Sequence, residues 1–441
     1  MQKDNLEDTI KKDSEKPLIG FLPCFYSMGE TIPLIKIAQS YQEMGGRVIF
    51  FSHRGEYEHF AEEIDCDIFE LSNILENLSK KGKKMFEQGK DLVKNLKNIY
   101  TPATIDKAVA EEINAFTKKN IKLVVSSFNL TTSISARAAN IPLITVVSGV
   151  TIPLYYESGF VTFPDNYENP FTFFLPKIIK NRFMQWFLLN NKMLIRPFNK
   201  VAKKYNVSQY NNFNEIILGD HTLVCDDFTF LGVNSSKESP RENFIGPIVG
   251  SKTFDKKEKS IDSDLTAHLE KPGKSIVLIM GSTGNRSLFL KIVKALDQTN
   301  YNVIAVYTNL LNNNEIPKTS ENILFKKFVP LDEILKKVDL AITHGGRGTI
   351  YQIAYSGKPA ICFPMFMEHQ GNVDNLIRHG SAVRLSKKFF KKEILLQSID
   401  NIFRKYESYQ QRAQQLAKSL QKDSGEIKAA KRLFEIMKLY Q

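Results

Sequence analysis

Short apolar runs alternate with longer segments of helical periodicity along most of this 441-residue chain. The runs have the length of buried strands, and between them apolar residues recur every three or four positions, as on one face of a helix. This alternation is typical of βαβ units and predicts parallel sheets. In the first half, strands are expected at 18–23, 47–52, 68–71, 123–126 and 144–148, and helices at 32–44, 76–99, 105–119 and 131–140.

The second half repeats the scheme, with strands expected at 275–280, 303–307, 323–326, 340–343, 360–363 and 382–385. Between the halves, residues 234–264 are rich in Ser, Pro, Gly and alternating charge, which is linker composition. Two doubly wound domains would place the carboxyl ends of their strands at a central cleft, the usual ligand site of open α/β sheets. The predicted divisions are a tail at 1–16, an N-terminal Rossmann-like domain at 17–245, a linker at 246–272, a C-terminal Rossmann-like domain at 273–420 and a final helix at 421–441.

Composition narrows the class of protein. The apolar content of 42% and charged content of 24% are those of a soluble globular protein. No run of 18 apolar residues exists, so no membrane-spanning helix is expected, and the polar N-terminus lacks the apolar core of a signal peptide. The four widely spaced cysteines indicate reduced residues in a cytoplasmic protein. The net charge of +12 could serve polyanionic partners or anionic lipid, but simple Lys-rich composition is favoured and no nucleic-acid partner is expected.

The glycine-rich stretch THGGRGT, residues 343–349, carries the clearest chemistry. It follows a predicted strand and opens a predicted helix, whose free N–H groups and dipole would form an anion site suited to phosphate. Gly346 and Gly348 would let the backbone approach phosphate oxygens, while Thr349 offers a hydroxyl and His344 an N–H donor. The stretch matches neither the Walker loop nor the dinucleotide fingerprint. On the glycines alone, a tight structural turn is as good an interpretation as a phosphate site.

The residues around this stretch extend the pattern. It is preceded by Pro330 and Asp339 and continues through Gln352, GKP, Pro364 and then EHQGN at 368–372. The series resembles the nucleotide-sugar signature of the family 1 glycosyltransferases, the UDP-glycosyltransferase superfamily with the GT-B fold. Weaker likenesses at IVLIMGST, NFIGPIV and the stretch from GETIP extend the resemblance over nearly the whole chain. It implies a GT-B fold, α/β with two Rossmann-like doubly wound domains facing a central cleft, and a final helix that packs back on the N-terminal domain.

The resemblance implies a donor site for a UDP-sugar in the C-terminal domain. His344 and the backbone of the glycine loop would hold the diphosphate, and Ser282 and Thr283 would close on it from the first loop. Phe328 and Val329 would receive the uracil. The implied donor-binding residues are Ser282, Thr283, Phe328, Val329, His344, Gly346, Arg347, Gly348, Thr349, Gln352, Glu368, His369 and Gln370.

Some of these positions depart from the family pattern. Gln352 stands where the family usually places a Glu on the ribose hydroxyls, and a neutral amide bonds a diol more weakly than a carboxylate. Glu368 and His369 occupy the acidic-then-Gln pair that grips the sugar, and neighbouring Gln370 could substitute for the replaced Gln. Arg347 fills the variable position of the motif. It would either add a charge beside the diphosphate or lie solvated at the helix start.

The resemblance also implies a general base. Family members commonly carry GHxxP after the first strand, with the His as base, whereas this chain has GETIP and places Glu30 there. A carboxylate can accept the acceptor proton, but its ordinary pKa of about 4.3 makes it weak unless burial raises that value. The Asp that usually partners the His is replaced by Ser127. The alternative is that Glu30 is merely an exposed acid at a helix start, and catalysis is favoured over it.

Residues 170–204 interleave aromatic and basic side chains at helical spacing. Such a segment could lie on an anionic membrane surface. Alternatively, it could be a core or pocket-wall helix of the N-terminal domain, which is the favoured interpretation and would place Phe171, Phe174 and Trp186 against the acceptor. Both interpretations indicate a hydrophobic acceptor, either a lipid or an apolar natural product.

We therefore predict a metal-independent, inverting hexosyltransferase that uses a UDP-sugar as co-substrate and needs no cofactor. It would be cytoplasmic, or peripheral on the cytoplasmic face of the membrane. Asp-x-Asp triplets at 65–67 and 262–264 lack the context of metal sites. The departures at Glu30, Gln352 and His369 leave open a non-catalytic nucleotide-sugar-binding protein of the same fold. A nucleotide-sugar epimerase is disfavoured because such enzymes lack the signature.

Overall fold

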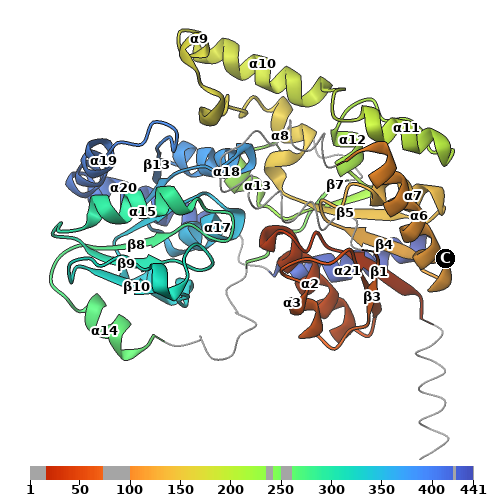
Figure 1. Cartoon of the computed structure of the whole chain (residues 1–441), viewed down its shortest axis with the longest axis horizontal. Helices are drawn as coiled ribbons and strands as arrows, with labels where there is room; N and C mark the ends of the chain where they lie inside the picture. Colours follow the sequence, from red (N-terminus) through yellow and green to blue (C-terminus); the bar gives the residue numbers. More distant parts are fainter. Residues whose placement is uncertain (1–15, 73–99, 235–241, 250–260, 421–423, 441) are drawn as a thin grey trace, which may run out of the picture.

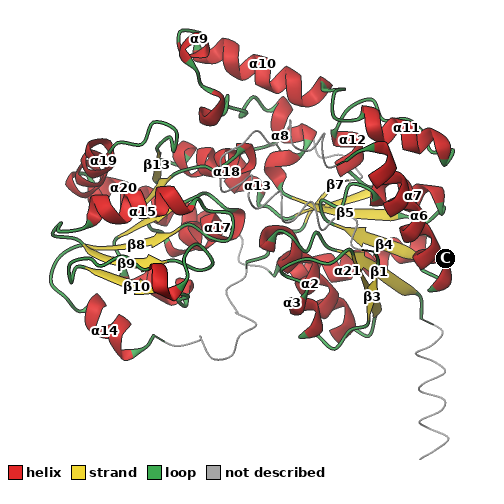
Figure 2. Ribbon diagram, viewed as in Figure 1, coloured by secondary structure: helices red, strands yellow, loops and turns green. Residues whose placement is uncertain are grey.

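The computed structural model describes residues 16–72, 100–234, 242–249, 261–420 and 424–440. Within them, two α/β domains lie side by side, each built on one twisted sheet with helices on its faces (Figure 1; Figure 2). The described strands form a seven-stranded sheet in the order β3-β2-β1-β4-β5-β6-β7 and a six-stranded sheet in the order β10-β9-β8-β11-β12-β13. The predicted class, two Rossmann-like α/β domains, is confirmed.

The strands of the first sheet are β1 Leu18–Leu22, β2 Arg47–Ser52, β3 Ile68–Glu70, β4 Leu123–Ser126, β5 Leu143–Val147, β6 His221–Val224 and β7 Glu242–Phe244. Those of the second are β8 Ser275–Ile279, β9 Asn302–Val306, β10 Ile323–Lys326, β11 Leu340–Thr343, β12 Ala360–Cys362 and β13 Ala382–Arg384. All pairs are parallel, so the carboxyl ends of neighbouring strands share one edge of each sheet.

The helices of the N-terminal domain are α2 Met28–Glu43, α3 His59–Glu62, α6 Pro102–Lys118, α7 Thr132–Ala138, α8 Pro153–Glu157, α9 Pro170–Phe173, α10 Lys177–Asn190, α11 Arg196–Lys204, α12 Asn214–Ile217 and α13 Phe228–Leu231. Those that follow are α14 Ser263–Leu269, α15 Arg286–Leu296, α16 Leu331–Lys337, α17 Arg347–Ser356, α18 Met367–Arg378, α19 Lys392–Arg404, α20 Tyr406–Ser419 and α21 Gly425–Leu439. Local signals fix several starts. At α6, for example, the Thr101 side chain accepts from the Thr104 N–H and Pro102 occupies the first turn.

Two strands escaped prediction, β6 and β7. The first reads HTLV and the second ENF, so neither contains the continuous apolar run that the predicted strands show. β7 lies inside the stretch interpreted as linker, at the sheet edge where a short strand needs few apolar residues. Helix α14 also lies within the expected linker, and the helix expected at 76–99 lies outside the described residues.

The last helix, α21, packs on the N-terminal domain rather than on the domain that precedes it in the chain. Leu433 and Ile436 are buried in the same apolar cluster as Leu34 of α2. The ring of Phe434 stacks on Tyr41, with centroids 4.2 Å apart. This helix therefore ties the two domains together through its connection to α20.

Helices α9 and α10 lie at the outer edge of the N-terminal domain, at the top of Figure 1. In α10, which is described in full, only Lys180 and Met184 are buried. The interpretation of residues 170–204 as core is therefore wrong for α9 and α10, because a core helix would bury its aromatic residues, whereas α11 does bury Phe198, Val201 and Ala202. None of the described helices has the length and apolarity to cross a bilayer.

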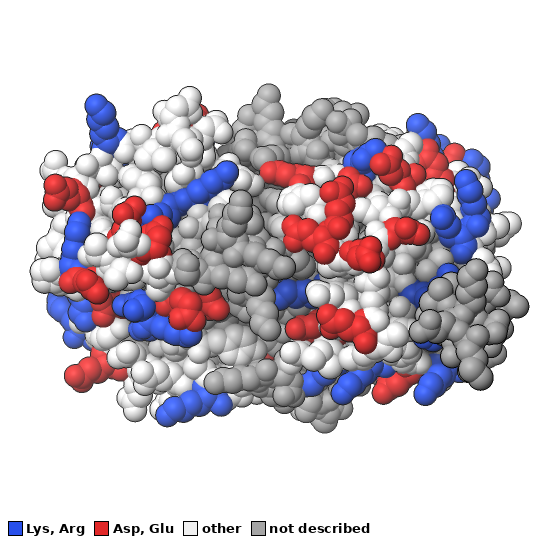
Figure 3. Space-filling model, turned by 90° about the horizontal axis from the view of Figure 1, so that it is seen from below, with Lys and Arg blue, Asp and Glu red and all other residues white. Residues whose placement is uncertain are grey.

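Charge is mixed on one face of the molecule. The face shown in Figure 3 lies opposite to α9 and α10 and carries Lys and Arg side chains interspersed with Asp and Glu.

Cys225 and Cys362 are buried, Cys24 and Cys66 are half-buried, and all four cysteines are free thiols.

Candidate functional site

The glycine loop connects β11 to α17 at the carboxyl edge of the second sheet. Thr343 and His344 are buried at the end of the strand, and Gly346 is the N-cap residue of α17. No described side chain caps this helix, so its first N–H groups are available to a ligand. A β-carbon at Gly348 would meet open space. This is the arrangement that an anion site at a helix N-terminus requires.

His344 is held tightly between two glycines. A β-carbon on Gly281, which has φ of +57°, would lie 2.4 Å from its Cε1 atom, and one on Gly346 would lie 2.6 Å from its Nε2 atom. Both positions therefore exclude any larger residue. Burial lowers the pKa of His344 to about 3, so the imidazole is neutral at physiological pH. It can offer an N–H to a phosphate oxygen but no positive charge.

His369 lies beneath this loop. Its ring packs at 3.7 Å from Phe366 and 4.8 Å from His344, centroid to centroid. Burial holds its pKa well below the ordinary value, and among the described residues its buried Nδ1 atom has no hydrogen-bond partner. This placement differs from the expected grip on the sugar, because the ring is covered by its neighbours and supports the loop.

The other expected donor residues lie around the same edge. Ser282 and Thr283 are half-buried in the loop after β8, while Phe328 is exposed and Val329 half-buried in the loop after β10. Gln352, on α17, has a buried Oε1 atom with no donor among the described residues. A buried acceptor without a donor is costly, and ribose hydroxyls would satisfy it.

Glu30 is half-buried in the first turn of α2, at the carboxyl edge of the first sheet. Burial raises its pKa to about 7, the positive charge of Arg347 opposes the rise, and the negative charge of Glu368 adds to it. The Ser127 hydroxyl donates to the Glu30 carbonyl at 2.9 Å. The carboxylate thus has the raised pKa that a general base near neutral pH needs.

Arg347 reaches from α17 to the other domain. It is 8% exposed, and its Nη2 atom donates to the Gly29 carbonyl at 2.9 Å. The expectation of a solvated side chain at the helix start is therefore wrong. Glu30 and Glu368 lie near enough for their charges to interact with the guanidinium.

Asp226 and Tyr351, which sequence reasoning missed, complete the contact between the domains. Asp226, at the carboxyl end of β6, is buried and accepts from the Tyr351 hydroxyl at 2.6 Å and from the Gly149 N–H at 2.5 Å. Burial raises its pKa, while Arg347 and these hydrogen bonds oppose the rise. Had β6 been predicted, the rule that ligands gather at carboxyl ends of strands would have singled out this acid.

Gln370 takes part in the contact between the domains rather than in a free sugar site. Its amide nitrogen donates to the Thr162 hydroxyl at 2.6 Å and to the Phe163 carbonyl at 3.0 Å, and its oxygen accepts from the Asp165 N–H at 2.9 Å. Both hydrogens of the amide nitrogen are already donated within the protein. The Gln370 side chain is therefore poorly placed to bind the sugar in place of the Gln that His369 replaces.

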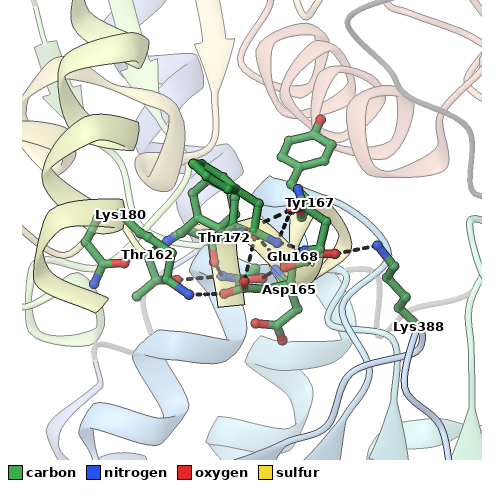
Figure 4. A network of polar contacts seen from close by, with 12 residues as sticks. Thr162, Asp165, Tyr167, Glu168, Thr172, Lys180 and Lys388 are labelled. Carbon is green, nitrogen blue, oxygen red and sulfur yellow. Dashed lines mark hydrogen bonds and ion pairs between the residues drawn. The ribbon is translucent and has the colours of Figure 1, made fainter. Parts of the chain in front are cut away.

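Figure 4 shows the polar network that extends from Thr162 and Asp165 towards α9 and α10. Glu168 is paired with the buried Lys180, and Lys388 of the C-terminal domain donates to the Glu168 carbonyl. Asp165 is bridged by Arg384, with Nε and the carboxylate oxygen 3.0 Å apart. The segment before α9 is thereby fixed to both domains.

The expected acceptor residues do not line a pocket with the donor loop. Phe171 on α9, Phe174 just after it and Trp186 on α10 are 79%, 84% and 59% exposed. Cavities of about 320 and 270 Å³ lie elsewhere in the N-terminal domain, one beside Arg137 and the other beside Tyr100. In the part of the chain that the structure describes, no group of three or more His, Cys, Asp or Glu could hold a metal ion.

Comparisons with known proteins agree with this architecture. Residues 275–432 match the model of the glycosyltransferase family 28 C-terminal domain. The chain is 29% identical over 178 residues to a UDP-N-acetylglucosamine--N-acetylmuramyl-(pentapeptide) pyrophosphoryl-undecaprenol N-acetylglucosamine transferase of Bacillus cytotoxicus, covering 37% of this chain and 48% of that protein. It is 24% identical over 224 residues to the uncharacterized UDP-glucosyltransferase YojK of Bacillus subtilis, covering 50% of this chain and 53% of that one. The chain thus spans about half the length of these relatives.

Among solved structures, the glycotransferase of kitacinnamycin superposes with a TM-score of 0.69 at 15% identity, over 96% of this chain and 99% of that one. At such identity the likeness concerns the fold, which is GT-B. The predicted GT-B fold is confirmed. The matching domain is that of family 28, whereas the motifs resemble family 1.

Proposed function

We propose that this chain, which belongs to the GT-B superfamily of glycosyltransferases, moves a hexosyl group from a UDP-sugar to a hydroxyl of a hydrophobic acceptor. Glu30 acts as the general base, and the transfer proceeds with inversion at the anomeric carbon. The glycine loop of residues 344–349 receives the diphosphate, and Gln352 bonds the ribose. Phe328 and Val329 flank the uracil, and Glu368 bonds the sugar hydroxyls.

One observation carries the proposal: a half-buried acid with a pKa of about 7 lies across the domain boundary from a helix N-terminus that no described side chain caps. The bond from Arg347 to Gly29 brings the loop and the acid together. At pH 7 a carboxyl group with this pKa is ionised in about half of the molecules. Its carboxylate form is also a stronger base than that of an ordinary Glu, and so can take the proton of a hydroxyl group.

The proposed reaction is a single displacement. Glu30 takes the proton of the acceptor hydroxyl as that oxygen attacks the anomeric carbon, and the bond between this carbon and the diphosphate oxygen breaks on the opposite face. The leaving diphosphate is stabilised by the N–H groups at the start of α17 and by the neutral N–H of His344, whose position is fixed in advance. Glu30 is left protonated and loses its proton to solvent before the next turnover.

The acceptor side rests on the surface formed by α9 and α10, which we name the aromatic face. Its exposed apolar residues are Phe171, Phe173, Phe174, Leu175, Ile178, Ile179, Phe183 and Trp186. Residues 170–190 contain Lys177, Lys180 and Arg182 and no Asp or Glu, and Lys180 is buried and paired with Glu168. Aromatic residues among positive charges suit the interface of an anionic bilayer, which would also present a lipid acceptor. We therefore propose peripheral attachment to a membrane through this face.

The activity is tested by incubating the protein with a panel of nucleotide sugars, a lipid extract and a set of apolar aglycones, followed by mass spectrometry and assay of released UDP. We expect a hexose-bearing product from a UDP-sugar, with inverted anomeric configuration by NMR. Binding of UDP-sugar without release of UDP would indicate the non-catalytic binding protein instead.

Membrane attachment is tested by sedimentation with vesicles. We expect binding to vesicles containing about 30% phosphatidylserine and weaker binding to pure phosphatidylcholine. Binding to the anionic vesicles should weaken with added salt, because salt screens the attraction between basic side chains and anionic lipid. Equal recovery in the supernatant with and without anionic vesicles would refute attachment and leave the transferase proposal standing.

A further inference from the structure

The first turn of α2 has an unusual hydrogen-bonding need. In an α-helix the carbonyl of each residue accepts from the N–H four positions later. The residue four positions after Gly29 is Pro33, which lies inside α2 and has no N–H. The Gly29 carbonyl is therefore left without its helical donor, immediately before the acid that the proposed mechanism uses as base.

Arg347 supplies the missing donor from the other domain. Its Nη2 atom donates to the Gly29 carbonyl at 2.9 Å, a bond between residues 318 positions apart in the chain. The next carbonyl, that of Glu30, accepts from Ser127 at 2.9 Å. The peptide of Glu30 is thus held on one side by its own domain and on the other by the donor loop.

From these contacts we infer that Arg347 is a positioning residue for Glu30, coupling the base to the donor loop, rather than a ligand of the diphosphate. The inference rests on the proposed function, since it assigns a role in that reaction. The guanidinium is buried and its Nη2 atom is committed to the Gly29 carbonyl, while its Nη1 atom has no hydrogen-bond partner among the described residues.

The charges around Glu30 give Arg347 a second effect. The titratable groups that interact with Glu30 are Arg347 of α17, Glu368 of α18, Cys24 after β1 and Cys225 after β6. Arg347 is the one cation among these named groups, and its charge lowers the pKa of Glu30 against burial and Glu368. Without it, the acid would hold its proton to a higher pH.

The test compares Arg347→Met and Arg347→Lys with the matched control Arg378→Met. Arg378 also crosses between the domains, with its Nη2 atom donating to the Leu231 carbonyl at 2.6 Å, but it lies in another part of the contact. For each variant, the pH dependence of kcat/KM and the affinity for UDP alone, by calorimetry, are measured.

Activity should rise with pH as Glu30 ionises, with a midpoint near 7 in the unchanged protein. For Arg347→Met we expect a midpoint about one pH unit higher, about tenfold lower kcat/KM at pH 7, and UDP affinity within about twofold of the parent. Arg347→Lys should keep the midpoint, because the charge remains, and lose turnover. Arg378→Met should leave the midpoint unchanged.

A double variant separates position from charge. Pro33→Ala restores an N–H to the Gly29 carbonyl, so in that background Arg347→Met should cost less in turnover while the midpoint still rises. An unchanged midpoint in Arg347→Met, or a loss of UDP affinity of tenfold or more, would overturn the inference. Absence of transfer by the unchanged protein would instead refute the proposed function.

Discussion

The glycine loop and the aromatic face differ in how they are built. The loop is packed and largely backbone: His344 fills a slot between two glycines, and the helix after it is uncapped by any described side chain. The aromatic face consists of exposed side chains such as Trp186 of α10, at the edge of the domain. Every nucleotide sugar has the same diphosphate group, so one arrangement of backbone N–H groups can bind it. A surface for an acceptor or a bilayer depends on side chains, which many sequences can supply.

The largest expected effect concerns the acid that joins the two regions. Glu30→Gln keeps the size of the side chain and removes the base, so we expect kcat to fall by about 10²- to 10⁴-fold while UDP affinity persists. Kinetics and calorimetry on the same preparation give both quantities. Turnover within a few-fold of the parent would remove Glu30 from the mechanism and leave the loop as a donor site with another base.

The donor loop is tested next by His344→Ala. The change removes an N–H donor and leaves a gap between Gly281 and Gly346, so we expect UDP to bind about tenfold more weakly, the value of one charge-assisted hydrogen bond. The control is His268→Ala, which removes a buried histidine of α14 away from the loop. If both variants bind UDP like the parent, the diphosphate does not contact His344.

The aromatic face is tested with the triple variant Phe171→Ser, Phe174→Ser, Trp186→Ser. Removing three exposed aromatic side chains should weaken binding to anionic vesicles by at least about tenfold, because each contributes apolar area at the interface. Activity on a water-soluble acceptor should be unchanged. Phe389→Ser, at an exposed aromatic residue of the C-terminal domain outside the aromatic face, is the control. Equal losses in the two variants would show that the face has no special role.

The smallest effect is on stability. The pKa of Glu30 in the folded protein, about 7, lies well above the ordinary value for a Glu side chain, so the folded state holds the proton more tightly. Ionised Glu30 therefore costs stability as pH rises from about 5 to 7, and Glu30→Gln should raise the free energy of unfolding by about 1–2 kcal/mol at pH 8 and by little at pH 5. Chemical denaturation at both pH values checks this. A gain that is equal at both values would mean that the acid is not perturbed by burial.

Sequence reasoning located the carboxyl edges of both sheets, because strands such as Leu340–Thr343 are continuous apolar runs. It also found the glycine loop, because a loop that binds through its backbone needs glycines at fixed positions and these are visible in the sequence. It could not place Asp226 or Arg347, because their partners Tyr351 and Gly29 lie in the other domain. The orientation of α10 was equally hidden, since an aromatic stripe at helical spacing has the same pattern whether it faces a core or a membrane.

The central claim is that the N–H groups at the start of α17 hold the diphosphate of a nucleotide sugar. A crystal structure of the protein grown with UDP tests it most directly. The account predicts diphosphate oxygens bonded to the backbone of residues 346–349, with the His344 N–H beside them and the ribose at Gln352. Clear density for UDP at another place, with this loop unoccupied, would contradict it.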